Sequence, residues 1–244
     1  MLLYDTELVY LKDAYRKELE TEILDIRNDP EGYPVIFLDA TIFYPEGGGQ
    51  PSDTGKIVGE GGTATVVHAK YVQGVVHHRC QIEGVLASED QVKCQLDWDQ
   101  RYRNMRIHTA GHLLHDALMQ LVPDAIPRKG HHWGKPFIEY SDPLPTEVAR
   151  ELENLANRMI TDDLQTHTRL VGLDELKAMS RFVPPNLPKD KPLRVFWIQG
   201  FDAMPDGGTH VKRTGELGRI RVVSISTKKG AGRIRYEVVD TEEP

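Results

Sequence analysis

Two histidines one helical turn apart form the first candidate site. His108 and His112 lie in the segment RIHTAGHLLH, residues 106–115. Residues i and i+4 share a helix face, so both imidazoles can reach one metal ion. Because the chain holds 10 histidines, such a pair also arises by chance, and a histidine in the core or on the surface is the alternative for each. Three further histidines are considered for the site and are left outside it: His115, a candidate base or partner of a ligand, and His131 and His132.

A second pair of candidate ligands follows later in the chain. Asp206 and His210 lie in the segment MPDGGTH, residues 204–210. The glycines allow the backbone to curve, so the carboxylate and the imidazole can converge. With the first pair they supply four nitrogen and oxygen ligands, the number in a tetrahedral zinc site, and in a catalytic site one of the four would give way to water or substrate. We therefore predict that His108, His112, Asp206 and His210 bind one divalent metal ion, with Zn²⁺ as the expected cofactor.

A glycine-rich loop is the third feature suited to ligand binding. In the segment TIFYPEGGGQPSDTG, residues 41–55, three glycines stand between aromatic residues and Gln50. Glycine lets backbone N–H groups approach a ligand closely, although a wide hairpin turn explains the same residues. The loop lacks the following helix and lysine of a phosphate-binding loop, so we exclude nucleotide binding of that type.

The residues before the first histidine pair are predicted to form a β-barrel. Short runs rich in β-branched residues alternate with turn signals such as residues 28–30 and 59–62. Strands of this length must close or pack to cover their edges, which favours a small barrel. The predicted strands span residues 20–26, 33–39, 55–58, 63–71, 75–81 and 92–98. Cys80 and Cys94 fall in two of these strands, and we expect both to be buried and unpaired.

The pattern then changes to helical spacing. Apolar residues recur at helical intervals from Ile107 to Leu121 and stop at Pro123. Asp97 or Asp99 is the expected N-cap of this helix. The helix would therefore carry the first histidine pair beside its apolar face.

The elements after this helix mix strands and helices. They are expected at residues 137–140, 146–162, 168–173, 174–179 and 193–198, with a hairpin over 217–240. Such an order indicates an α+β protein with two domains. We predict a small β-barrel-like domain over residues 1–98, which contains the glycine-rich loop. An α+β domain over residues 99–244, with helices packed on an antiparallel sheet, would hold the metal site.

Composition excludes a membrane protein and places the chain in solution. The 244 residues are 39% hydrophobic and 27% charged, which suffices for one large or two small domains. Mean hydropathy is −0.45, and no apolar run approaches the ~18 residues of a bilayer span. A soluble cytoplasmic protein without a membrane or obligate protein partner is expected.

Charge is distributed unequally along the chain. Residues 1–100 hold 8 Lys and Arg against 18 Asp and Glu. Eight cations gather between residues 211 and 237, where the sequence offers only Glu216 and Glu237: Lys212, Arg213, Arg219, Arg221, Lys228, Lys229, Arg233 and Arg235. This basic hairpin could meet the phosphates of a nucleic acid, or could carry its cations on a solvated face. The alternative RNA-binding cations are Arg101, Arg103, Arg128 and Lys129.

Three segments together resemble a known family. TIFYPEGGGQPSDTG, RIHTAGHLLHDAL and DGGTHVKRTGELGRI are similar, in this order, to the editing module of alanyl-tRNA synthetases. They are more closely similar to the freestanding alanyl-tRNA editing proteins, the AlaX group. The similarity spans roughly residues 35–240 and is specific as a set.

The resemblance implies an aminoacyl-tRNA deacylase that acts in trans on mischarged tRNA(Ala), chiefly Ser-tRNA(Ala). The family binds zinc through HxxxH followed by CxxxH, and His108, His112 and His210 match this pattern. Asp206 stands where the family usually has Cys, which gives a harder ligand set and puts the identity of the metal in question. The resemblance assigns discrimination of serine to Thr41, whose hydroxyl could bond the serine hydroxyl. Gln50 is the second candidate for this role.

Two other functions remain open. A noncatalytic RNA-binding relative that has lost its metal would fit the change from Cys to Asp. A metallohydrolase for a small ester or amide would fit the acidic first part of the chain. Covalent catalysis is not favoured, because no Ser-His-Asp or Cys-His signature is present.

Overall fold

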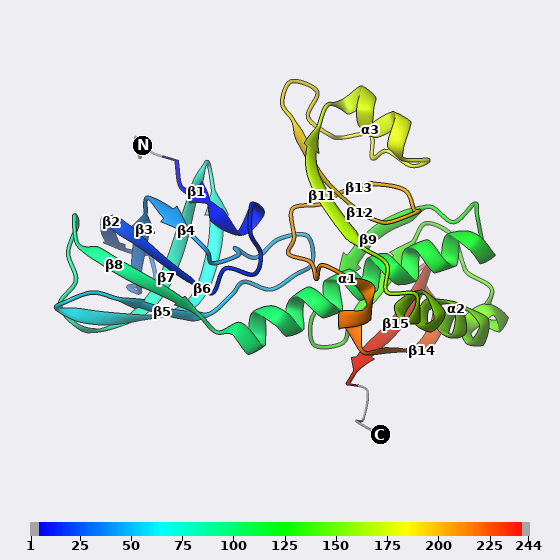
Figure 1. The fold of residues 1–244 in the computed structure, drawn as a ribbon, viewed down its shortest axis with the longest axis horizontal. Coiled ribbons are helices and arrows are strands. Elements are labelled where there is room, and N and C mark those ends of the chain that lie inside the picture. The colour runs from blue at the N-terminus through cyan, green and yellow to red at the C-terminus, as the bar shows by residue number, and fades with distance from the viewer. Residues whose placement is uncertain (1–4, 241–244) are drawn as a thin grey trace. The chain divides into compact units, whose positions relative to one another are not determined.

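The computed structural model describes residues 5–240 and divides into two compact units between Asn104 and Met105 (Figure 1). We call residues 5–104 the barrel unit and residues 105–240 the second unit. Each is an independent set of packed elements, and both helices and antiparallel sheets occur in the chain. The chain is thus α+β, as predicted.

Six antiparallel strands of the barrel unit close into a barrel. Their order is β2-β3-β7-β6-β5-β8. The strands are β2 (Glu18–Asn28), β3 (Pro34–Leu38), β5 (Gly55–Val58), β6 (Gly62–Val72), β7 (Val75–Gly84) and β8 (Gln91–Leu96). Inward positions hold aliphatic side chains together with Cys80 and Cys94, which are buried and unpaired as predicted. Closure removes the exposed strand edges.

Two very short strands of the barrel unit were not predicted. β1 (Glu7–Leu8) pairs in parallel with β4 (Ala40–Thr41), and a single 3₁₀ turn (Val9–Leu11) follows β1. Strands of two residues carry no alternation that a sequence pattern could reveal. β4 places Thr41 directly after the predicted strand that became β3.

Helix α1 (Trp98–Leu121) carries the histidine pair. Asp97 caps it, because its Oδ1 accepts a hydrogen bond from the Gln100 N–H at 3.2 Å. The prediction that β8 continues to Trp98 was therefore wrong at that end. The division between the units falls inside α1, whereas the predicted boundary stands at its start.

One buried ion pair joins the first turns of α1 to the barrel unit. Arg101 and Asp53 are both fully buried, and Arg101 Nε lies 2.9 Å from Asp53 Oδ2. Arg101 also donates to the Ala14 carbonyl at 2.7 Å and to the Ile42 carbonyl. A guanidinium with these partners cannot contact RNA, so Arg101 is removed from the alternative RNA-binding cations.

The second unit is built on a four-stranded antiparallel sheet in the order β14-β15-β10-β9. Its strands are β9 (Pro127–His131), β10 (Phe137–Tyr140), β14 (Arg219–Lys228) and β15 (Ala231–Val239). β9 was not predicted, because a strand with proline and glycine at a sheet edge lacks strand-forming composition. Helix α2 (Ala149–Thr161) contacts β14 through Asn157, whose side chain bonds both backbone groups of Ile220 at 2.8 and 3.0 Å.

A three-stranded sheet completes the second unit. It contains β11 (Thr166–Val171), β12 (Leu193–Ile198) and β13 (Met204–Pro205) in that order, and α3 (Leu173–Met179) follows β11. Short 3₁₀ helices cover Thr146–Val148 and Thr214–Leu217. β13 ends immediately before Asp206 and thus sets the start of the second ligand segment. Within residues 5–240, no helix is long and apolar enough to cross a membrane.

Candidate metal centre

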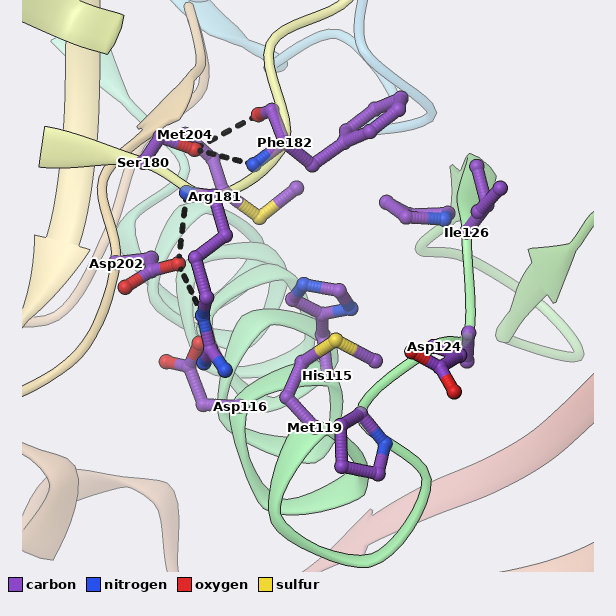
Figure 2. A pocket seen from close by; sticks show the side chains of 13 residues that line it. His115, Asp116, Met119, Asp124, Ile126, Ser180, Arg181, Phe182, Asp202 and Met204 are labelled. Atoms are coloured by element: carbon purple, nitrogen blue, oxygen red, sulfur yellow. Dashed lines mark hydrogen bonds and ion pairs between the residues drawn. The ribbon is translucent and has the colours of Figure 1, made fainter. Parts of the chain in front are cut away.

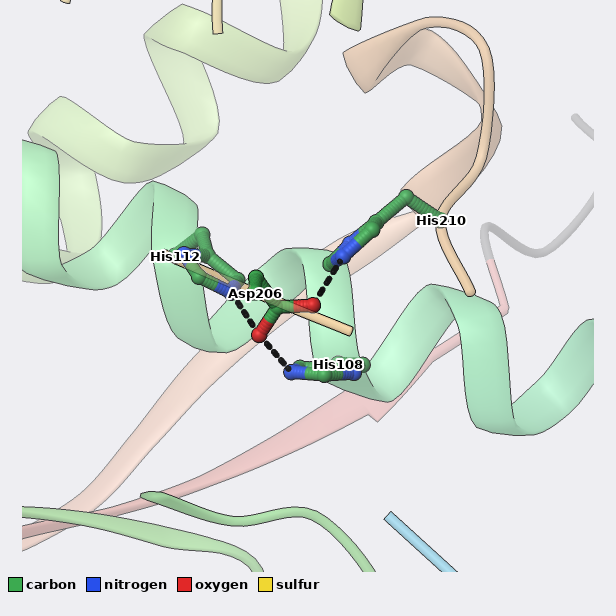
Figure 3. Close-up of side chains that lie close together, drawn as sticks. All are labelled: His108, His112, Asp206 and His210. Carbon is green, nitrogen blue, oxygen red and sulfur yellow. Dashed lines mark hydrogen bonds and ion pairs between the residues drawn. The ribbon is translucent and has the colours of Figure 1, made fainter. Parts of the chain in front are cut away.

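The four predicted ligands converge in the second unit. His108 and His112 project from one face of α1, and Asp206 and His210 come from the glycine turn after β13 (Figure 3). One ligand atom from each residue lies within 4.8 Å of the others. We call these four residues the His₃Asp cluster. Elements distant in the sequence therefore bring together the set that spacing alone suggested.

Two distances within the His₃Asp cluster match the separation of ligand atoms around a tetrahedral ion. His108 Nε2 and His112 Nε2 lie 3.3 and 3.4 Å from the same Asp206 Oδ2. Ligand atoms at ~2.0–2.1 Å from a tetrahedral zinc ion are separated by ~3.3–3.4 Å. The other oxygen, Oδ1, lies 2.9 Å from His210 Nε2 and accepts the Gly208 N–H at 2.6 Å. Three imidazole nitrogens and one carboxylate form a donor set that suits Zn²⁺.

Electrostatics keep the cluster in the protonation state that binds a cation. Burial opposes ionisation of Asp206, but His108 and the hydrogen bonds from the imidazoles hold the pKa of this carboxyl well below its usual range. Burial lowers the pKa of His112 and His210, although Asp206 opposes the shift. These shifts favour an ionised Asp206 beside neutral His112 and His210, and a metal site needs its carboxylate ionised and its imidazoles neutral.

Two neighbours hold the ligand rings in place. Gly208 makes room for His108, because a Cβ there would lie 2.2 Å from the His108 Cε1 atom. His210 Nδ1 lies 3.2 Å from the Thr109 hydroxyl, which also accepts the Val211 N–H. When Nε2 ligates a metal ion, Nδ1 carries the proton and donates it to Thr109, an arrangement that orients a metal-binding histidine.

His132 is a neighbour of the cluster that the sequence prediction left out. Its ring is buried and stacks on His108 with centroids 4.3 Å apart. Tyr236 donates its hydroxyl proton to the Ile107 carbonyl at 3.0 Å, so His132 Nδ1 donates to Tyr236 at 2.8 Å. Gly111 permits this packing, since a Cβ would meet His132 at 2.6 Å. No periodicity marks His132, because it follows the end of an edge strand.

Thr41 and Gln50 lie in the barrel unit, and both are buried. Thr41 Oγ1 lies 2.8 Å from His78 Nε2 and accepts the Phe43 N–H at 3.1 Å. Gln50 pairs through its backbone with Gly47, which closes the glycine loop as a tight turn. The role of these two side chains in selectivity stays a prediction.

The direction of the hydrogen bond between Thr41 and His78 follows from the tautomer of His78. His78 Nδ1 lies 2.9 Å from the Ile36 carbonyl, which can only accept a hydrogen bond, so Nδ1 carries a proton. Burial lowers the pKa of His78 to about 4, and the ring is therefore neutral near pH 7. Its Nε2 must then accept the proton of Thr41. The Thr41 oxygen keeps one lone pair for a further donor.

Several cations of the basic hairpin have acidic partners that the sequence prediction missed. Arg213 pairs with Asp163 at 2.7 Å, and Arg219 lies 3.8 Å from Glu153. Arg233 lies 2.6 Å from Glu139. The segment itself contains only Glu216 and Glu237, and the fold adds Asp163, Glu153 and Glu139 from other parts of the chain.

Comparisons with known proteins give one family match within each unit. Residues 5–100 match the family model for class II (A) tRNA synthetases, and residues 193–235 match the second additional domain of threonyl and alanyl tRNA synthetases. An alanyl-tRNA editing protein AlaX-M of Methanosarcina barkeri is 31% identical over 96% of this chain and 100% of its own length. The chain belongs to the alanyl-tRNA editing protein AlaX family.

Two further relatives show which part of the chain shares this similarity. The AlaX-M of Saccharolobus solfataricus is 36% identical over 96% of this chain and 99% of its own length. The alanine–tRNA ligase of Pyrococcus abyssi is 31% identical over 91% of this chain, which spans 24% of that ligase. The AlaX likeness therefore covers both units. The matched range 193–235 includes Asp206 and His210 of the cluster.

Proposed function

We propose that this protein hydrolyses the ester bond of mischarged tRNA(Ala), chiefly Ser-tRNA(Ala), and thereby acts as an aminoacyl-tRNA deacylase. The observation that carries the proposal is the His₃Asp cluster, with its ligand atoms within 4.8 Å of one another, in a chain of the alanyl-tRNA editing family. The relatives' names supply tRNA as the substrate class. The His₃Asp cluster provides the ligands for a metal ion that could activate water or polarise the ester.

The His₃Asp cluster would hold the metal, with Zn²⁺ as the proposed ion. Zinc bound there would polarise the ester carbonyl or lower the pKa of a bound water. The protein's part is to fix the donors. His132 packs against His108, and Thr109 fixes the ring of His210, so two of the ligand rings are oriented before substrate binds.

A basic cleft supports an RNA substrate. It has a volume of about 440 Å³ and is lined by five cations around Glu139: Arg128, Lys129, Lys228, Lys229 and Arg233. The β9, β10 and β15 strands place Lys129, Glu139 and Arg233 side by side in register. The cleft thus combines cations of the basic hairpin with Arg128 and Lys129, which were separate alternatives in the sequence. We propose that it holds phosphates of the tRNA.

Selectivity for serine is assigned to Thr41, by the family resemblance of its motif. Since its own proton is donated to His78, Thr41 could only accept a hydrogen bond from the serine hydroxyl. The alanine side chain has no hydroxyl and therefore cannot donate this hydrogen bond. We propose that this difference distinguishes the two esters, with Gln50 as the other candidate.

Deacylation of Ser-tRNA(Ala) beside Ala-tRNA(Ala), with and without a metal chelator, tests the proposal. We expect rapid loss of serine, slow loss of alanine, and no activity after chelation until Zn²⁺ is restored. A small seryl ester serves as the second substrate. Equal rates on that ester and on the tRNA would instead identify a small-ester hydrolase. Purified protein that binds tRNA without zinc or hydrolysis would identify a noncatalytic relative.

A further inference from the structure

The second unit has two hollows that differ in charge. The basic cleft is lined by five cations and Glu139. The other pocket, of about 420 Å³, has the guanidinium of Arg181 among three carboxyls, which belong to Asp116, Asp124 and Asp202. Figure 2 shows that this guanidinium is bonded to Asp202, so the residues that line the pocket offer no unpaired cation to a phosphate. An RNA backbone therefore fits the basic cleft and not this pocket.

The basic cleft lies on the face of the four-stranded sheet that turns away from α1. Tyr140 and Tyr236 mark the face toward α1, because their hydroxyls contact residues of this helix at 3.1 and 3.0 Å. Side chains alternate between the two faces along a strand. We call the opposite face the outer face. On the two central strands, β10 and β15, its side chains are those of Phe137, Glu139, Arg233 and Arg235.

A row of rings runs along the outer face toward the basic cleft. The ring centroids of Trp133 and His131 lie 5.3 Å apart, and His131 stacks on Phe137 at 5.2 Å. The guanidinium of Arg233 follows, 3.9 Å from the centre of the Phe137 ring. We call these four side chains the aromatic row. Since Arg233 also lines the cleft, the row and the cleft form one continuous surface.

The far end of the aromatic row is open to solvent. Trp133 is 55% exposed, although an indole is among the side chains that gain most from contact with a partner. The residue before it, His132, is buried and stacks on His108 of the metal centre, so the two neighbours have different surroundings. The indole is therefore available to a molecule that binds on the outer face.

Rings beside cations match the chemistry of unpaired RNA. Each base has a flat face that stacks on an aromatic side chain, and each phosphate is attracted to Lys or Arg. In a duplex the base faces are covered by neighbouring bases, so only unpaired nucleotides can stack on an indole. Arg235 is opposite Phe137 in the sheet register and makes no ion pair within residues 5–240. It supplies an unpaired cation beside the row.

We propose that the aromatic row binds an unpaired stretch of RNA, with a base stacked on Trp133 and phosphates at Arg235 and the basic cleft. The inference rests on the proposed function, which makes tRNA the bound molecule. Because α1 and its metal ligands lie on the other face of the sheet, the nucleotides held here are not the one that carries the ester. The row would hold the tRNA without contacting the reacting bond.

Binding of an unacylated, fluorescently labelled oligoribonucleotide tests the row without any hydrolysis. Trp133→Ala should weaken binding of the single strand about five- to hundredfold through the loss of stacking, and should not weaken binding of the same RNA in a blunt duplex. Trp133→Phe keeps a ring and should retain the affinity within about threefold. Tyr71→Ala removes an aromatic side chain of similar exposure, 49%, from the barrel unit and is the matched control. Equal affinities of Trp133→Ala and the unaltered protein for the single strand would overturn the proposal.

The salt dependence of single-strand binding separates stacking from charge. Trp133→Ala should lower the affinity at every salt concentration and leave the slope of log affinity against log salt unchanged. Arg235→Gln should reduce this slope by about 0.7, the value for one phosphate of a single strand. Lys189→Gln, at an exposed position outside the row, is the control for the lost charge. An unchanged slope in Arg235→Gln would remove this residue from the RNA surface and overturn that part of the proposal.

Deacylation assays separate this inference from the proposed function. If Ser-tRNA(Ala) is deacylated and Trp133→Ala raises KM with little change in kcat, both stand. If Ser-tRNA(Ala) is deacylated and Trp133→Ala alters neither single-strand binding nor KM, the aromatic row fails and the function remains. If no tRNA is deacylated but the single strand binds through Trp133, the function fails and the aromatic row remains an RNA-binding site.

Discussion

At the scale of single residues, the His₃Asp cluster makes a quantitative prediction about metal content. The double variant His108→Ala plus His210→Ala should lose bound zinc, because it removes two of the three imidazoles. Asp206→Cys should keep one zinc per chain, since thiolate is a softer ligand that zinc accepts. Elemental analysis of purified protein checks both. His167→Ala, outside the cluster, is the control, and full zinc occupancy in the double variant would disprove the site.

Thr41 makes a prediction about both selectivity and stability. Thr41→Val removes the hydroxyl and leaves the Nε2 atom of His78 without a donor, so the free energy of unfolding should fall by about 1–3 kcal/mol. If Thr41 also reads serine, the ratio of Ser to Ala deacylation rates should fall about ten- to hundredfold. Thr41→Ser keeps the hydroxyl and should retain the ratio. A destabilised Thr41→Val protein with an unaltered ratio would make Thr41 structural and leave Gln50 for testing.

The residues of the cluster could be predicted from sequence, whereas their surroundings could not. Spacing on a helix and a glycine turn suffices to nominate four ligands. His132 and the aromatic row carry no such pattern, and they matter because of packing between elements far apart in the chain. Asp53 stands within the glycine-rich motif, yet its partner is the buried Arg101 and not a ligand.

At the scale of elements, we predict that the Arg101–Asp53 pair anchors the first turns of α1 to the barrel unit. Arg101→Met leaves a buried carboxylate without its counter-charge and should cost about 3–5 kcal/mol of unfolding free energy. Urea denaturation followed by circular dichroism measures the change. Arg103→Met on the same helix is the control. A cost below about 1 kcal/mol would show that water or another group can replace the guanidinium.

The basic cleft predicts a change in salt dependence. Lys228→Gln plus Lys229→Gln should weaken binding to every tRNA and reduce the slope of log affinity against log salt by about 0.7–0.9 for each phosphate that is no longer neutralised. Lys189→Gln plus Lys191→Gln changes the charge equally at exposed positions outside the cleft. Filter binding over a range of salt concentrations distinguishes them. An unchanged slope in the cleft variant would place the RNA elsewhere.

Longer elements could be predicted and the shortest could not. The six barrel strands have enough residues to show β-branched composition and alternation, and each expected strand has its counterpart. β1, β4 and β13 have two residues each. Their pairing depends on tertiary contacts, which no local pattern encodes.

At the scale of the whole molecule, buried histidines predict loss of stability in acid. The pKa of His78 falls from 6.5 to about 4 on burial. The unfolded chain therefore binds a proton that the folded chain does not, and stability declines as the pH falls through this window. The contribution of His78 alone is up to about 3 kcal/mol. Urea denaturation of metal-free protein at several pH values should show a shallower decline for His78→Gln. Equal declines would contradict the assignment.

Helix α1 also determines where a stable fragment of the second unit can begin. The compact units divide at Asn104 and Met105, but a fragment that starts there begins in mid-helix without Asp97 as its N-cap. Loss of a cap costs about 1 kcal/mol, and the first turn of the new end has no acceptors for its N–H groups. His108 would then stand in a fraying turn. A fragment that begins before Asp97 keeps the cap, although it carries residues that belong to the other unit.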